Sequence, residues 1–169
     1  AYKKALSIKP DYAEAYNNMG NALKDQGKLE EALAAFKEAI SIEPDFAEVH
    51  WNRSGTVENI SEAKQWLTKC LEANPNHTKA KLTLIALKFY EGDKSEFNEL
   101  IKSPIKDHPF TRSFVWTFNL PKLPHLHFHR WALFDHVTEL SKKDRPFYEF
   151  GVWRGEAFRY LIKTFKKGY

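Results

Sequence analysis

The sequence contains a single cysteine, Cys70, among 169 residues, so no disulfide can form within the chain. It has no long uncharged apolar run and a mean hydropathy of -0.57, which argues against a membrane-spanning helix. The first residues, AYKKALSIKP, lack the apolar core of a secretory signal. These absences predict a cytoplasmic protein that folds around a hydrophobic core.

Charge and aromatic residues are distributed unevenly along the chain. Residues 1–100 hold 13 Lys and Arg against 16 Asp and Glu, whereas residues 101–169 hold 13 against 6. The second region also holds 15 of the 25 aromatic residues. This shift predicts two structural regions. The basic residues of the second region lie partly at a helix end, where they are usually solvated, so nucleic-acid binding is not expected.

An internal repeat covers the first region. The segments ALSIKPDYAE and AISIEPDFAE place Pro10 and Pro44 at a spacing of 34 residues, and CLEANP ends at Pro75, 31 residues later. A period of this length predicts supersecondary units that stack on one another. Each proline is expected to precede a new helix. Asp11 with Glu14, and Asp45 with Glu48, are predicted as N-cap and N3 residues.

The residues inside the repeat fit two packed antiparallel helices. Gly20 is small where the helices must approach closely, and Gly27 supplies the turn between them. A buried stripe is predicted from Leu23, Leu29, Leu33, Phe36 and Ile40, with Ala32 and Ala39 keeping the helices close. The pattern resembles the tetratricopeptide repeat (TPR) family, which implies a solenoid of helical hairpins over residues 1–101.

Later repeats depart from the first one. The helix from Ala47 is expected to be shorter than its counterpart in the preceding repeat. Residues 78–91 are predicted as another first helix, with Leu82, Ile85, Ala86 and Phe89 on one face. A turn at Gly92 and a short helix over residues 94–102, capped by Asp93 and Glu96, are expected to follow.

The resemblance to TPR proteins also implies a function. First helices of this family line a concave face that binds an extended peptide or partner segment. Asparagines near the middle of these helices can hold a peptide backbone, because a side-chain amide both donates and accepts hydrogen bonds. The predicted peptide-binding residues are Asn17, Asn18, Asn21, Asn52 and Arg53. The alternative is that Asn18 and Asn21 merely face water.

Residues 102–126 are predicted to form an aromatic helical linker. Phe110, Phe114 and Phe118 recur at every fourth position, which favours a helix over a strand. The sequence HLHFH, residues 125–129, has a spacing that can chelate zinc, but no cysteine or carboxylate lies close in sequence to complete the ligand set. No metal site is therefore predicted.

Residues 145–169 contain a strand-like run, a loop with two glycines and a helical pattern, which is how a doubly wound nucleotide-binding fold begins. The string EFGVWRG, residues 149–155, resembles the first motif of S-adenosylmethionine-dependent methyltransferases. Within this family, residues 127–169 resemble the methyltransferases that are similar to macrocin O-methyltransferase. The resemblance implies that the cofactor is bound by Glu149, Gly151, Arg154, Gly155 and Glu156.

The sequence thus predicts a mainly α chain: a TPR solenoid, then helices and the first strand, loop and helix of a Rossmann-like α/β domain. The predicted function is a protein-interaction scaffold joined to the beginning of a methyltransferase, with no catalytic residue in this stretch. A pure interaction module and a glycosyltransferase fragment are the alternatives. Both ends fall inside predicted units, so we expect an excerpt of a longer protein whose exposed ends favour a homodimer.

Overall fold

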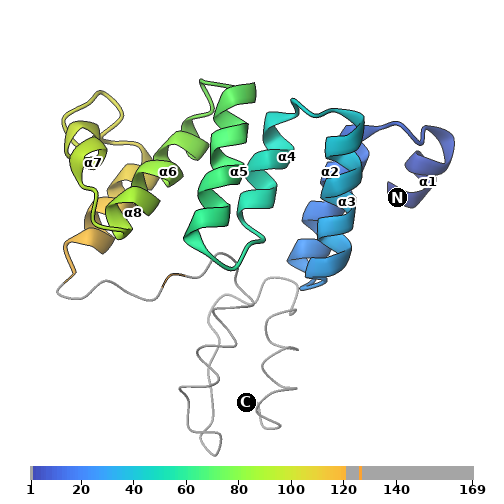
Figure 1. The fold of residues 1–169 in the computed structure, drawn as a ribbon, viewed down its shortest axis with the longest axis horizontal. Coiled ribbons are helices and arrows are strands. Elements are labelled where there is room, and N and C mark those ends of the chain that lie inside the picture. The colour runs from blue at the N-terminus through green and yellow to red at the C-terminus, as the bar shows by residue number, and fades with distance from the viewer. Residues whose placement is uncertain (1, 121–125, 127–169) are drawn as a thin grey trace, which may run out of the picture. The chain divides into compact units, whose positions relative to one another are not determined.

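The computed structural model describes residues 2–120 and residue 126. In this part of the chain the backbone forms helices and no strand. In chain order (Figure 1) the helices are α1 (Tyr2–Ile8), α2 (Ala13–Asp25), α3 (Leu29–Ile42), α4 (Ala47–Ser54), α5 (Ile60–Ala73), α6 (Thr78–Tyr90), α7 (Ser95–Leu100) and α8 (Pro109–Phe118). The predicted α class is confirmed for these residues, and the predicted strand, loop and helix of residues 145–169 lie outside them.

Successive helices pack against one another along the chain. Helix α2 packs on α3, α4 on α5, and α5 on α6, while α2 and α3 both contact α4. Residues 2–120 all belong to one compact unit. None of these helices is both long and apolar enough to cross a membrane.

Helices α2 and α3 form the predicted helix pair. Gly27 lies between them with a φ of 77°, a backbone conformation that a side chain would strain. The amide nitrogen of Lys28 donates to the Leu23 carbonyl at 3.0 Å and closes the end of α2. The predicted turn is therefore confirmed.

The contact between α2 and α3 is close at Gly20 and Phe36. Phe36 is 0% exposed, and a Cβ atom on Gly20 would lie 2.6 Å from its Cε1 atom. The predicted close approach is confirmed. The predicted stripe is confirmed only in part, because Leu23, Leu29, Leu33 and Ile40 are half-buried, while the fully buried residues of α3 are Phe36 and the alanines Ala32, Ala35 and Ala39.

The predicted N-caps of α2 and α4 are wrong by one residue. The cap residues are Tyr12 and Phe46, and neither side chain makes a capping hydrogen bond to a backbone amide of its helix. The reason is that each proline and the residue after it form a turn ahead of the helix. In the second turn the amide nitrogen of Phe46 donates to the Glu43 carbonyl at 3.2 Å, and the fixed φ of proline suits the second position of such a turn. Asp11 and Asp45, predicted as N-caps, therefore lie before the caps, and Glu14 and Glu48, predicted at the third helical position, lie at the second.

Helix α4 has 8 residues against 13 in α2, so the predicted shortening is confirmed. Helix α5 begins after Asn59, whose side-chain oxygen accepts a hydrogen bond of 2.9 Å from the Glu62 amide. Helices α5 and α6 and the loop before α5 share a buried core made of Val57, Ala63, Leu67, Cys70, Ala80 and Leu87. Ala47 and Trp51 of α4 pack against the same core, so α4, α5 and α6 share it.

Helices α6 and α8 confirm two further predictions. Helix α6 covers most of the predicted range 78–91, and Leu82, Ile85 and Ala86 on its predicted face are buried. Residues Phe110, Phe114 and Phe118 of α8 pack on a core shared by α6 and α7. The ring of Phe118 stacks on that of Phe89 with centroids 4.0 Å apart. The aromatic stripe of α8 therefore covers apolar residues of α6 and α7.

The turn between α6 and α7 is confirmed, but its capping differs from the prediction. Gly92 has a φ of 104°, and the Asp93 carboxylate accepts from the Ser95 amide at 3.0 Å. Glu96 does not cap the helix, because its carboxylate pairs with the Lys88 ammonium on α6. This ion pair ties α7 to α6.

We expect Gly20→Ala to lower the free energy of unfolding by about 1–3 kcal/mol, because the new Cβ atom would overlap the buried Phe36 ring. Urea unfolding followed by circular dichroism measures this loss. In a Phe36→Leu background the ring is absent, so the same substitution should cost less. An equal cost in both backgrounds would show that the Gly20–Phe36 contact is not responsible.

Candidate functional site

The structure brings together two of the five residues predicted to bind a peptide. Asn17 on α2 and Asn52 on α4 are both buried, and the Asn52 Nδ2 atom donates to Asn17 Oδ1 at 2.8 Å. Removing either amide would leave the other buried without this partner, which typically costs about 1–3 kcal/mol. The pair therefore fixes the register of α2 against α4 as well as the orientation of both amides.

A hollow of about 700 Å³ opens beside this pair. Asn17 and Asn18 lie in its wall. The other lining residues come from the α1–α2 turn, the start of α2, the end of α3 and the start of α4: Lys9, Asp11, Tyr12, Ala13, Glu14, Ile42, Glu43, Phe46 and Glu48. Both proline turns thus border the hollow, so the 34-residue repeat builds its two sides.

Asn18 and Asn21 are both half-buried. Asn18 lines the hollow with Asn17. Asn21 lies one turn further along α2, on the same side as Asn17 because residues four apart face the same way. Asn18 is thus accessible from the hollow, whereas Asn21 is not among the residues that line it.

Arg53 lies in a different environment from the asparagines. Its guanidinium donates to Thr56 Oγ1 at 2.9 Å, contacts the Glu62 carboxylate at 3.4 Å, and lies 5.1 Å from the centre of the Trp66 ring. Burial lowers the pKa of Arg53, and the Glu62 carboxylate opposes this shift. Arg53 therefore joins α4 to α5, and its hydrogen bonds are made within the chain.

Sequence reasoning did not identify His77, which caps α6 and links it to α4. Its Nδ1 atom accepts from the Ala80 amide at 3.1 Å, and its Nε2 atom lies 3.1 Å from the Glu48 carboxylate. Because Nδ1 accepts, the proton resides on Nε2 and is donated to Glu48. The Trp51 ring packs against the imidazole with centroids 5.4 Å apart. The position after a proline turn could have suggested a cap, but histidine is not among the residues that usually cap helices.

Cys70 is the only cysteine of the chain and is buried in α5. Burial, together with the nearby Glu48 carboxylate, raises the pKa of the thiol to about 11, although a backbone hydrogen bond from Trp51 opposes this shift. The thiol is therefore protonated at neutral pH, and the thiolate, which is the nucleophilic form, is disfavoured.

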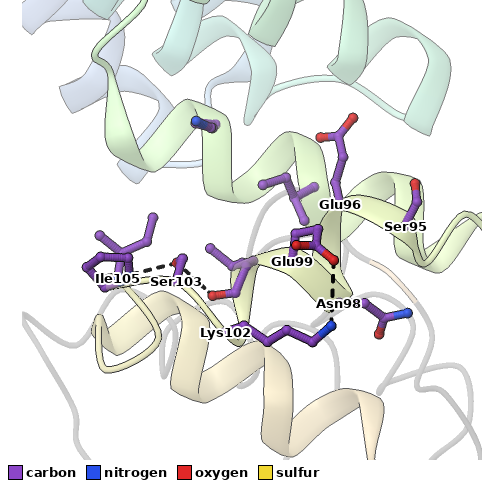
Figure 2. Close-up of a pocket in the computed structure, with 11 residues that line it drawn as sticks. Ser95, Glu96, Asn98, Glu99, Lys102, Ser103 and Ile105 are labelled. Carbon is purple, nitrogen blue, oxygen red and sulfur yellow. Dashed lines mark hydrogen bonds and ion pairs between the residues drawn. The ribbon is translucent and has the colours of Figure 1, made fainter.

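A second hollow, of about 970 Å³, lies against α6 and α7. Figure 2 shows that its polar groups bond mainly to near neighbours. Lys102 pairs with Glu99 at 3.6 Å, and Ser103 Oγ donates to the Leu100 carbonyl at 2.7 Å. The Ile105 amide donates to the same hydroxyl at 3.3 Å. No arrangement of a nucleophile and a base is formed by these groups.

The predicted cofactor residues lie outside the described residues: Glu149, Gly151, Arg154, Gly155 and Glu156. The histidines of residues 125–129 lie outside them as well. Among residues 2–120 and residue 126, no group of three or more histidine, cysteine or carboxylate side chains could hold a metal ion.

Comparison with known proteins identifies the helical repeats. The tetratricopeptide repeat family matches residues 13–46 and, through a second description of the same repeat, residues 56–77. These repeats indicate a protein–protein interaction module. No curated protein matches the chain. Because the matched ranges end at residue 77, the resemblance of residues 127–169 to methyltransferases stays a prediction.

We expect His77→Ala to lower the free energy of unfolding by about 1 kcal/mol, because the Ala80 amide loses its cap. His77→Asn should lose less, since asparagine also accepts a hydrogen bond at this position. Urea unfolding of the two variants tests the difference. Equal losses would mean that the ring contacts of His77, rather than the cap, stabilise α6.

Proposed function

We propose that the helical repeats bind an extended segment of a partner protein at the hollow beside Asn17 and Asn18. The observation that carries this proposal is the buried hydrogen bond from Asn52 to Asn17 at the wall of the hollow. It holds the Asn17 amide in one orientation before any partner arrives. A donor that is already oriented loses less conformational entropy on binding.

The chemistry of the lining supports a polypeptide as the partner. An extended peptide presents backbone carbonyl and amide groups that need hydrogen-bond partners. Asn17 can donate through Nδ2, and the Asn18 amide can both donate and accept. Tyr12 and Phe46 add aromatic surface to the same hollow. The TPR matches support the same class of function, since the first of them, residues 13–46, contains Asn17 and Asn18.

Substitution of Asn18 tests this proposal without removing a buried hydrogen bond. Peptides selected from a random dodecapeptide phage library against the chain should bind about tenfold more weakly to the Asn18→Ala variant, equivalent to about 1.4 kcal/mol. Fluorescence anisotropy with the labelled peptides measures the change. Asn76→Ala is the matched control, because Asn76 is an exposed asparagine outside the hollow.

Equal affinities of the chain and the Asn18→Ala variant for every selected peptide would contradict the proposed surface. Equal losses in the Asn18→Ala and Asn76→Ala variants would contradict it as well. Thermal unfolding of both variants confirms that each remains folded at the temperature of the binding measurement.

We propose, second, that the chain joins this binding module to the beginning of an S-adenosylmethionine-dependent methyltransferase. The string EFGVWRG at residues 149–155 favours this proposal. Its glycines permit close approach of the backbone to a ligand, and the helical pattern after them would offer free amides. Glu149, Gly151 and Gly155 would contact the methionine part of the cofactor, with Arg154 and Glu156 nearby. The proposal rests on the sequence motif alone.

Calorimetric titration of S-adenosylhomocysteine tests the second proposal. We expect heat of binding from a longer chain in which the motif is followed by the rest of such a domain, and none from residues 1–169, because residues 149–155 match only the first motif of the cofactor site. Gly151→Val in the longer chain should abolish binding, because the valine side chain would occupy the space in which the backbone approaches the ligand. Absence of binding by the longer chain would contradict the proposal and favour a pure interaction module or a glycosyltransferase.

A further inference from the structure

We propose that the hollow beside Asn17 selects a basic partner segment, one that carries lysine or arginine side chains. This inference rests on the proposed function and adds the chemical class of the partner. The hollow is lined by the carboxylates of Asp11, Glu14, Glu43 and Glu48, whereas Lys9 is the one cationic residue in its lining. An excess of one charge in a concave site attracts ligands of the opposite charge.

The negative charge of the hollow is largely uncompensated within the described part of the chain. No ion pair forms there at Asp11, Glu14 or Glu43, and Glu14 only accepts a hydrogen bond of 3.1 Å from the Tyr12 hydroxyl. That carboxylate raises the pKa of Tyr12. Glu48 accepts from His77. The Lys9 ammonium lies over the Tyr12 ring, 5.2 Å from its centre, so a cation already occupies the rim of this surface.

A second observation points to a ligand at the same place. Asn17 is only 3% exposed, and its Oδ1 atom is occupied by Asn52. Its Nδ2 atom donates to none of the residues that the structure describes, and it is not one of the fully buried side-chain atoms that lack a partner there, so water or a ligand can reach it. Asn17 lines the hollow, so this donor is available to a backbone carbonyl of the partner.

The two features act on different parts of one ligand. The donor on Asn17 holds the backbone of an extended segment, and the surrounding carboxylates bind its cationic side chains. Glu14 and Glu43 come from α2 and the end of α3, so they approach the segment from two elements. Charge complementarity of this kind raises the rate of association and excludes acidic segments.

Three labelled peptides with the repeats Gly-Ser-Lys, Gly-Ser-Gln and Gly-Ser-Glu test this inference by fluorescence anisotropy on the full 169-residue chain. We expect the lysine peptide to bind at least about tenfold more tightly than the glutamine peptide, with an affinity that falls as salt is added, and the glutamate peptide not to bind. The Glu14→Gln/Glu43→Gln variant should lose about tenfold in affinity for the lysine peptide.

Glu58→Gln/Glu72→Gln is the matched control, because it removes the same charge from exposed residues outside the hollow. Equal losses in the two variants would overturn the inference, since attraction would then follow net charge alone. Failure of all three peptides to bind would also overturn it. Equal binding of the glutamine and lysine peptides, lost in Asn18→Ala, would overturn the basic partner and leave the proposed protein-binding function standing.

Discussion

A single helical hairpin has more apolar surface than it can bury alone, and this constraint determines how the described helices are arranged. Phe36 of α3 is covered by Gly20 of the same hairpin, but the core around it also needs Val49 from α4. In the same way, Leu67 of α5 is buried together with Ala80 from α6. Each hairpin is therefore stable only because its neighbour in the chain completes its core.

The polar contacts depend on this packing order. Because α4 is held against α3, Asn52 reaches Asn17 on the preceding first helix, and His77 reaches Glu48 across the next interval of the repeat. Each of these bonds joins first helices of consecutive units. The hollow lies between the two proline turns because the 34-residue spacing repeats the same turn and helix. The candidate site and the core therefore both follow from this spacing.

The sequence was sufficient to predict the helices of this region, the turns at Gly27 and Gly92, and the aromatic stripe of α8. These features depend on residues close together in the chain or on one regular spacing. The N-caps of α2 and α4 could not be assigned correctly, because the turn geometry of the proline segments moves the start of each helix by one residue.

The candidate site was predictable only in part. Spacing indicates which residues share a helix face, but it does not indicate which neighbouring helix a side chain meets. Asn17 therefore turned out to be the partner of Asn52, whereas Arg53, adjacent to Asn52 in sequence, contacts Glu62 and Trp66 on α5. The acidic residues that line the hollow come from four separate segments, so no single segment of the sequence indicated its net charge.

Helix α1 has 7 residues, fewer than an isolated helix needs to be stable in water, so it depends on its contact with α2. The turn that follows it supplies Lys9, Asp11 and Tyr12 to the hollow. That wall is complete only while α1 is docked. Occupancy of the hollow and docking of α1 are thus thermodynamically linked. A ligand that contacts this wall stabilises the docked α1, and a change that destabilises the docking of α1 weakens binding of the ligand by the same free energy.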